Sequence, residues 1–342
     1  SKIAVSYSTS FGLLQTMFDF TILVVSDAHA SSVALTLDIL AAAAAMAPRV
    51  GAAMPRWRVR SFTEGPTRLS NDLLLDAKRL GNRAKPDNSI WVVPGLATNS
   101  AELVASRVSQ PDALLATKAL KTQGQSGGMV AASCSAVFLL QAAGLLKNKK
   151  VTTTWWLASH LQNIEPECMV DANRMVIADG NIWTAGAALA QTDLMLQLIR
   201  ARFGSALADA VSRVLLIDGR EAQAPFIAPA MLANGDDFIA QLSSQIDAAF
   251  PHTLSVADMA KKLCISERTL ARRVKAATGK NTSVLIQFVR LKRARMLLET
   301  SRMSVDQVSE NVGYRDATAL RRLMRKVFGA TPRQLRASVR IS

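Results

Sequence analysis

Residues 255–275 of this chain recur 49 positions further along, at 304–324. The two copies share a starting Ser, a Thr and a pair of arginines, and the apolar positions between them remain apolar: Ser255/Ser304, Val256/Val305, Thr269/Thr318, Arg272/Arg321, Arg273/Arg322, Met259/Val308, Leu263/Val312 and Val274/Leu323. A fixed period with matching polar and apolar positions indicates one structural unit used twice. The last third of the chain is therefore expected to contain two equivalent units.

Each copy has the pattern of two helices separated by a tight turn. Ser255 and Ser304 precede short apolar-periodic segments and have an acid or amide three residues on, which is typical of helix N-caps. The first helices are expected to end near Leu263 and Val312. Ser266 and Asp316 then cap the second helices, at 267–277 and 317–328. This helix-turn-helix order places the second helix of each unit in the major groove of DNA.

Residues 283–299, between the two copies, have apolar residues at three- and four-residue spacing, so we expect one helix. At ~1.5 Å per residue it would be about 25 Å long. Such a rod could hold two reading helices about one DNA turn, roughly 34 Å, apart. Thr331-Pro332 is expected to start a last helix, because Pro is favoured at the first helical position.

The charge is concentrated in this repeated part. Residues 251–342 contain 20 Lys and Arg against 6 Asp and Glu, whereas residues 1–250 contain 21 against 20. A basic domain binds nucleic acid by neutralising phosphates and releasing counterions. The alternative is a charged, solvated surface that serves solubility. The repeated motif favours double-stranded DNA as the partner.

Residues 240–342 resemble the AraC/XylS-type DNA-binding domain. The signature segment of that family is matched by Val312-Gly313-Tyr314, Leu320, Phe328-Gly329, Thr331-Pro332 and Leu335-Arg336, although the family usually has an aromatic residue in place of Leu335. The resemblance implies a sequence-specific transcription regulator, more often an activator, that contacts RNA polymerase.

Positions in the two second helices divide into expected base-reading and phosphate-binding side chains. Arg can bridge guanine O6 and N7, while Ala and Thr methyl groups can contact thymine. We expect base contacts from Glu267, Arg268, Ala271, Arg272, Arg315, Ala317, Thr318, Arg321 and Arg322. We expect phosphate contacts from Lys275, Lys280, Arg325, Lys326 and Arg333.

The nearly neutral part of the chain alternates strand-like and helix-like segments. Apolar strands are expected at 21–25, 57–62, 90–93 and 129–132, with helices at 32–47, 136–143 and 187–203. This order indicates a doubly wound, mainly parallel α/β sheet covered on both faces, so the whole chain is α/β plus all-α. We expect an amino-terminal extension at 1–19, the α/β domain at 20–205, a linker at 206–239 and the DNA-binding domain at 240–342.

The α/β domain resembles the PfpI-like, class I glutamine amidotransferase-like domains. The resemblance is carried by Gly127-Gly128-Met129, Cys134, Ala143-Gly144-Leu145-Leu146, Thr153-Thr154 and Thr184-Ala185-Gly186. It implies a sharp elbow at Cys134, before a helix N-terminus that favours thiolate. The family's catalytic His and acid are absent, because Trp155 and Ser32 stand at those positions. We therefore expect a non-catalytic sensor.

Two other functions remain open for this domain. The first is a Cys134-dependent amidase or hydrolase tethered to DNA, for which His29 is a possible base. The second is a purely structural domain on a constitutive DNA binder. A further interpretation is that Cys134 is simply a small residue of the core.

Two kinds of effector are suggested by the sequence. Trp155 and Trp156 could bind an amino-acid-derived or quaternary-ammonium metabolite through a cation–π face, unless they are core residues. Arg79 and Arg83, four apart across a Gly, resemble the arginine pair of PilZ-type cyclic di-GMP binders, with a solvated loop as the alternative. Arg56, Arg58 and Arg60 share one face of a strand and could support an anion site or simply face solvent. The expected effector residues are thus Arg79, Arg83, Cys134 and Trp155.

The remaining features limit cofactors and location. The three cysteines, Cys134, Cys168 and Cys264, have neither disulfide nor metal-ligand spacing, so we expect no metal and no cofactor besides the effector. No apolar run is long enough to cross a membrane, and no secretory signal is recognisable. We expect a cytoplasmic homodimer without a membrane partner.

Overall fold

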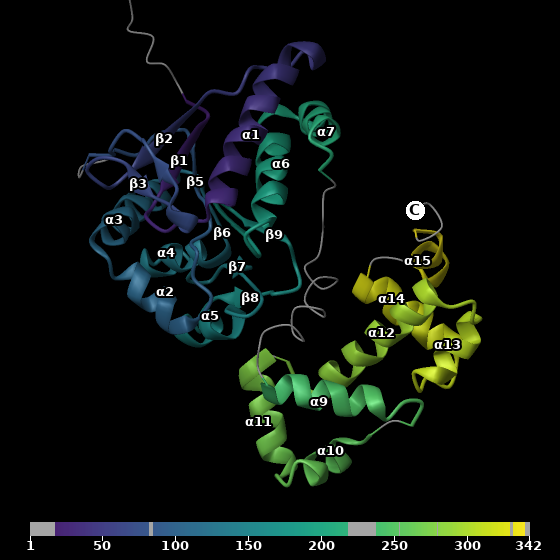
Figure 1. Ribbon diagram of the computed structural model, residues 1–342. Helices are drawn as coiled ribbons and strands as arrows, with labels where there is room; N and C mark the ends of the chain where they lie inside the picture. The colour runs from purple at the N-terminus through teal and green to yellow at the C-terminus, as the bar shows by residue number, and fades with distance from the viewer. Residues whose placement is uncertain are drawn as a thin grey trace, which may run out of the picture.

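The computed structural model describes residues 18–81, 85–217, 237–252, 254–278, 280–328 and 331–338. It has an α/β part followed by an all-helical part, as Figure 1 shows. A six-stranded sheet in the order β2-β1-β5-β6-β10-β9 forms the centre of the first part. Its strands are β1 (Phe20–Val24), β2 (Trp57–Ser61), β5 (Ile90–Val93), β6 (Val130–Ser133), β9 (Val176–Asp179) and β10 (Ile182–Ala185). All neighbours are parallel except β9 and β10, which confirms the doubly wound sheet.

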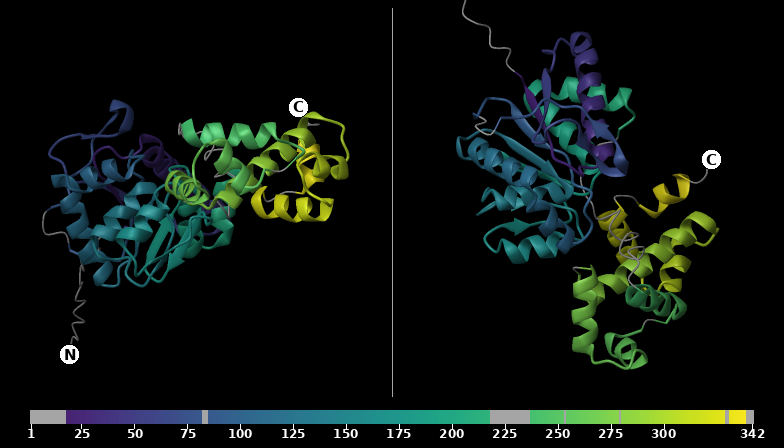
Figure 2. Two further views of the ribbon diagram at one scale, coloured as in Figure 1. Left: turned by 90° about the horizontal axis from the view of Figure 1, so that it is seen from below. Right: turned by 60° about the vertical axis from the view of Figure 1, so that its left-hand side comes forward.

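Helices cover both faces of this sheet (Figures 1 and 2). One face packs against α1 (Ala30–Met46), α6 (Ala190–Phe203) and α7 (Ser205–Val214). The other packs against α2 (Ala101–Val108), α3 (Pro111–Gln125), α4 (Val137–Ala142) and α5 (Ala158–Ile164). Because β1, β5 and β6 are buried on both faces, their residues are almost all apolar. The carboxyl ends of the strands form the edge where ligands bind in such folds.

Helix α1 corrects the expectation that no apolar run of this chain is long enough to cross a membrane. Together with the following 3₁₀ turn it spans Ala30–Val50, which is long and apolar enough to cross a membrane by length and composition. It packs against α6 and α7, and its Ile39, Leu40 and Ala43 are fully buried in the core. These contacts explain the apolar sequence as that of a core helix.

Smaller elements connect this framework. They are β3 (Thr67–Arg68) paired with β4 (Leu74–Leu75), β7 (Lys150–Val151) paired with β8 (Met169–Val170), and the 3₁₀ turns η1 (Ala47–Val50), η2 (Ser70–Asp72) and η3 (Cys134–Ala136).

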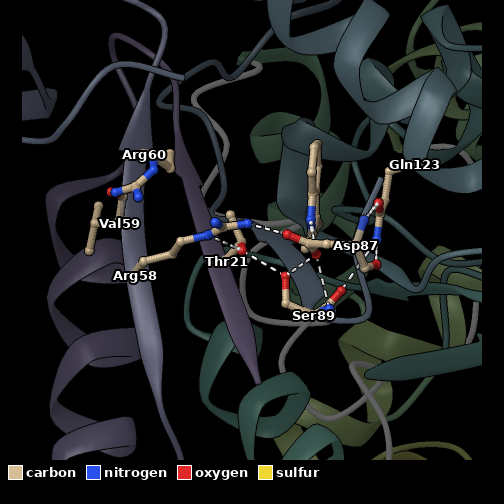
Figure 3. Close-up of polar contacts among 8 residues, drawn as sticks. Thr21, Arg58, Val59, Arg60, Asp87, Ser89 and Gln123 are labelled. Atoms are coloured by element: carbon tan, nitrogen blue, oxygen red, sulfur yellow. Dashed lines mark hydrogen bonds and ion pairs between the residues drawn. The ribbon is translucent and has the colours of Figure 1, made fainter. Parts of the chain in front are cut away.

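Arg58, on the edge strand β2, has a structural role (Figure 3). Its side chain donates a hydrogen bond to the Thr21 hydroxyl at 2.9 Å and forms an ion pair with Asp87. Asp87 also accepts hydrogen bonds from the Ser89 hydroxyl and from Nε1 of Trp91. Asp87 precedes β5, so the network lies at the amino ends of the strands. Arg58 therefore does not support an anion site at the opposite edge.

The helical part contains the two expected units, linked by one long helix. Their helices are α10 (Val256–Lys262), α11 (Glu267–Thr278), α13 (Val305–Asn311) and α14 (Ala317–Phe328), and α12 (Thr282–Thr300) connects them. Helices α9 (Asp237–Ala248) and α15 (Pro332–Ser338) complete the fold. Figure 1 shows α11 and α14 near opposite ends of α12.

The two units also agree in their local geometry. Ser255 and Ser304 each form a capping box, with Asp258 and Gln307 as the reciprocal partners. The turns of the two units contain Cys264 and Gly313, which are 49 positions apart and have φ values of 53° and 77°. A left-handed residue at the same place in both turns confirms the repeat. In the first unit a non-glycine residue adopts this costly conformation.

Both ends of the expected linker differ from the prediction. Helix α7 packs against α1 and α6, so the α/β domain continues beyond residue 205. Helix α9 starts at residue 237, and its Ile239, Leu242 and Ile246 are buried with residues of α10, α11 and α12. Helices α7 and α9 have apolar residues at helical spacing. These residues pack into the core of the α/β domain and of the helical domain, respectively.

Candidate ligand pocket and nucleic-acid interface

Cys134 stands on a sharp elbow between β6 and η3. Its φ is 54°, in the left-handed region, and its backbone N–H donates a hydrogen bond to the Gly186 carbonyl at 2.7 Å. Gly95 lies against the elbow so closely that a Cβ there would be 2.7 Å from the Cβ of Cys134. The Ser135 hydroxyl donates to the Leu96 carbonyl at 2.8 Å. The loop after β5 and the elbow therefore fix each other.

The environment of the Cys134 thiol opposes activation. The residue is 1% exposed, and burial raises the pKa of its thiol, although hydrogen bonds with Ser135 act in the opposite direction. A nucleophilic cysteine needs a lowered pKa or an adjacent base. The direction of this pKa shift is opposite to the expectation that the elbow favours thiolate, because desolvation outweighs the hydrogen bonds with Ser135 and Thr154.

A cavity of about 650 Å³ opens beside Cys134 at the carboxyl edge of the sheet. Its wall includes Trp155, at the position expected for a catalytic His. The other lining residues are His29, Ala97, Thr98, Asn99, Leu103, Trp156, Met175, Ala187, Ala188, Leu189 and Ala190. The structure therefore brings Cys134 and Trp155 together in one site, as predicted.

Most of this lining was not singled out from the sequence. Thr98, Asn99 and Met175 come from loops, and residues 187–190 precede or begin α6. Short loop segments of this kind carry no motif, so their convergence follows only from the sheet topology.

The residues at the family's other catalytic positions do not complete a catalytic site. The Ser32 hydroxyl donates to the Ala188 carbonyl at 3.1 Å, on the wall of the cavity. His29 lines the cavity, and burial lowers the pKa of its imidazole, which favours the neutral form. Across the described part of the chain, no hydrogen bond joins His29 to Cys134. Within the described residues, the hydrogen-bond partners of the thiol are Ser135 and Thr154, neither of which is a base.

Arg79 lies in a different cavity, of about 980 Å³, which shares Ala97, Thr98 and Leu103 with the first. Arg79 forms an ion pair with Glu64 at 2.6 Å. Arg83 lies outside the described residues. The four expected effector residues thus do not form one pocket.

The larger cavity is lined by acidic groups as well as by Arg79. Asp27, Glu64 and Asp112 all contribute to its wall. Arg107, also in this wall, is already paired with Asp112 at 2.6 Å. Within the described ranges, no cluster of His, Cys, Asp and Glu could hold a metal ion.

The second helices of the two units present the side chains expected to read bases. Glu267, Arg268, Ala271 and Arg272 are exposed on α11. On and before α14, the exposed members of the predicted set are Arg315, Thr318, Arg321 and Arg322. Asp316 caps α14 by accepting hydrogen bonds from the N–H groups of Thr318 and Ala319, at 2.6 and 2.9 Å. Both helices can therefore enter a groove with their amino-terminal halves.

Ala317 is the exception among these residues. It is 4% exposed, because its position at the start of α14 faces the helix packing. The prediction of a base contact from Ala317 is therefore corrected.

The predicted phosphate ligands lie on accessible parts of the same units. Lys275, Arg325, Lys326 and Arg333 are exposed, and Lys280 is half-buried. Arg273, by contrast, stacks on Phe238 of α9, with 4.9 Å between its guanidinium and the ring centroid. This residue has a packing role that the repeat alone did not reveal.

An α/β domain with a thiol elbow, joined to two helix-turn-helix units with exposed arginines, defines a two-part DNA-binding regulator. The sequence agrees. Residues 63–201 match the DJ-1/PfpI family, and residues 259–338 match the helix-turn-helix domain. The chain thus combines a DJ-1/PfpI domain with an AraC-type helix-turn-helix domain.

Relatives with both parts are named regulators. The HTH-type transcriptional regulator ArgR of Pseudomonas aeruginosa is 26% identical over 278 residues, which are 78% of this chain and 84% of that protein. The HTH-type transcriptional regulator GlxA of Rhizobium meliloti is 29% identical over 220 residues, 64% of this chain and 68% of that one. A crystal structure of an AraC family transcriptional regulator from Pseudomonas putida covers 58% of this chain and 100% of its own, at 17% identity and a TM-score of 0.46.

Proposed function

We propose that this protein is a ligand-responsive transcription regulator that reads two adjacent DNA segments with α11 and α14. Its α/β domain binds a small-molecule effector in the Cys134 cavity and performs no catalysis. We further propose that the chain acts in the cytoplasm as a homodimer, binds promoter DNA, and activates transcription by contacting RNA polymerase.

The observation that carries this proposal is the paired exposure of matching arginines. Arg272 and Arg321 occupy equivalent places in the repeat, and both are exposed on the second helix of a capped unit. Helix α12, with 19 residues, is about 28 Å long at ~1.5 Å per residue. Its ends are thus separated by a distance close to one helical turn of DNA, roughly 34 Å.

The acidic groups around Arg79 argue against cyclic di-GMP as the effector. A phosphodiester entering that cavity would meet Asp27, Glu64 and Asp112, and Arg79 would first have to leave Glu64. Like-charge contacts of this kind oppose binding. The Cys134 cavity is therefore the better candidate for an effector site.

The alternative of a Cys134-dependent hydrolase has one supporting observation, the strained elbow itself. Its reaction would need a base for the thiol, and burial raises the pKa of that thiol, which favours the protonated form. The named regulators among the relatives also favour the sensor.

Selection of binding sites from random DNA by the full chain tests the proposed function. We expect two preferred segments about one turn apart. Arg321→Ala should relax base preference in one segment only, at a cost of about 1–3 kcal/mol for a lost bidentate contact. No preferred sequence with the unchanged protein would contradict the proposal.

Lys326→Ala is the matched control on the same helix. Lys326 is exposed and is expected to bind phosphate. This variant should bind all sequences more weakly and reduce the slope of log K against log salt by about 0.9. A relaxed base preference in Lys326→Ala instead would exchange the two assigned roles.

A further inference from the structure

Trp155 and Trp156 form a corner between the two parts of the molecule. They follow β7 and precede α5, and their rings meet edge to face with centroids 5.4 Å apart. Both indoles line the Cys134 cavity. Trp156 also packs against the core formed by α2–α5 and the sheet. The corner is therefore anchored in the α/β domain.

The same corner belongs to the core of the DNA-binding domain. Trp155 is only 6% exposed and is part of one buried apolar cluster with Phe288 and Leu291 of α12. Val284 of α12, together with Trp156, packs against that cluster. Helix α12 is also the element that connects the two reading units. One indole thus forms both a wall of the cavity and part of the support of this helix.

We propose that this tryptophan corner couples the Cys134 cavity to α12, so that an uncharged, largely apolar effector and the docked position of α12 favour each other. This rests on the proposed sensor function. In the structure, Trp155 contributes to the cavity wall and to the α12 cluster at the same time. A molecule filling the cavity adds contacts to the indoles, one of which belongs to the cluster that includes α12 residues.

The residues that line the Cys134 cavity indicate the chemical class of the effector. Among the described residues that line this cavity, none is Lys, Arg, Asp or Glu, and burial lowers the pKa of His29, which favours its neutral form. An amino acid or a betaine would have to bury a carboxylate without a cationic partner, which is costly. The wall is instead mostly Ala, Leu, Met and Trp, as in pockets for apolar ligands.

Two buried polar atoms of the lining can orient such a molecule. Nε1 of Trp156 and the hydroxyl of Thr98 have no hydrogen-bond partner among the described residues. Buried polar groups normally have partners, so a ligand that shifts the side chain of Trp156 or Thr98, both in the cavity wall, can supply the missing one. Because the indole N–H can only donate, the effector needs an acceptor such as a carbonyl oxygen.

Coupling of this kind is reciprocal. If a ligand strengthens docking of α12, docking must strengthen ligand binding by the same factor. A change on α12 that loosens docking should therefore weaken binding in the cavity, although it touches no cavity residue.

Fluorescence titration of the full chain with prodan, an uncharged naphthyl ketone, tests both parts of the proposal. We expect saturable binding with a blue shift, and weaker binding of the anionic dye anilinonaphthalene sulfonate. Leu103→Trp, at the cavity wall, should weaken prodan binding, whereas Leu114→Trp should not, since Leu114 is equally exposed but lies outside the lining. Tighter binding of the anionic dye, or equal effects of the two variants, would overturn the assigned ligand class or site.

The coupling is tested by Val284→Lys, which places a charge against the shared cluster. We expect its Kd for prodan to rise about five-fold or more, within the usual range of coupling between sites. Met296→Lys is the control, since Met296 is 40% exposed on the same helix. Circular dichroism melts of both variants verify that α12 remains folded.

A double variant separates coupling from general damage. In Trp155→Leu, the additional change Val284→Lys should have little further effect on prodan binding, because the connecting side chain is already lost. Full additivity of the two changes, or an unchanged Kd in Val284→Lys, would overturn the coupling. Neither outcome would affect the DNA-binding function, which the site selection tests independently.

Discussion

Cys134 combines the backbone of a reactive elbow with the surroundings of a core residue. Its place on a sharp elbow after β6 is the expected one, and its φ is left-handed, but the thiol is buried and its pKa is raised. The strain of the elbow persists because Gly95 and Gly186 hold it from both sides. In this chain the elbow shapes a cavity.

Alkylation with iodoacetamide distinguishes a reactive, catalytic Cys134 from a buried one that only shapes the cavity. Only the thiolate reacts, so a group with a raised pKa reacts less at a given pH. We expect Cys134 to be labelled about ten-fold or more slowly than Cys264 between pH 7 and 9, since Cys264 is exposed. Peptide mapping after labelling provides the rates. Faster labelling of Cys134 near pH 7 would favour the hydrolase.

At the scale of elements, Arg107 and Asp112 fasten the loop after β1 to the helices α2 and α3. The guanidinium makes two hydrogen bonds to the carboxylate, at 3.0 and 2.6 Å, and a third to the Ser26 carbonyl at 2.9 Å. Asp112 also accepts a hydrogen bond from the Ser26 N–H at 2.9 Å. Burial alone would raise the pKa of Asp112, but these hydrogen bonds and the charge of Arg107 hold it below its usual value.

Asp112→Ala should lower the free energy of unfolding by about 3–5 kcal/mol, because it removes the nearer acidic partner of the buried Arg107 and leaves only Asp27, at 3.8 Å. Urea unfolding at pH 7 measures this loss. The exposed pair Arg200–Asp209 is the control, and Asp209→Ala should cost less than about 1 kcal/mol.

The stability that the Arg107–Asp112 pair contributes also depends on pH. A carboxylate with a depressed pKa contributes stability above its unfolded pKa of about 4, and this contribution is lost as the pH falls through the lower folded pKa. The difference between the wild type and Asp112→Ala should therefore shrink below about pH 4. A difference that stays constant in acid would contradict the ion-pair explanation.

Local signals determined how well each element could be predicted. The helices of the repeat begin at Ser255, Ser304 and Asp316 as expected, because a capping side chain acts within three residues of its own position. Helices α2 and α3 were missed, although Ser100 caps the first and Pro111 begins the second. Helix α2 is short, both helices are mixed in polarity, and packing on the sheet stabilises them.

The site was predictable only in part for a related reason. Cys134 follows a strand of the central sheet, so a fold-level argument places it at the carboxyl edge, and Trp155 was placed there by the family resemblance. The buried cluster that Trp155 shares with residues of α12 joins positions more than a hundred apart, which no local pattern encodes. Ala317 was misassigned because its position in the repeat does not reveal which side of α14 it faces.

At the scale of the whole molecule, charge and function are divided between two parts. The helical end carries nearly all of the net positive charge, and the α/β part carries the cavity. The two parts meet at the tryptophan corner and α12. In the proposed function, one chain reads two DNA segments whose spacing is set by α12.

The most direct measurement of this claim is the affinity of the full chain for its selected site when bases are inserted between the two segments. Five added base pairs turn one segment by about half a helical turn, and ten restore its face but move it roughly 34 Å away. Since α12 has a fixed length, we predict that either insertion reduces the affinity to that for a single segment. Unchanged affinity after either insertion would contradict the claim.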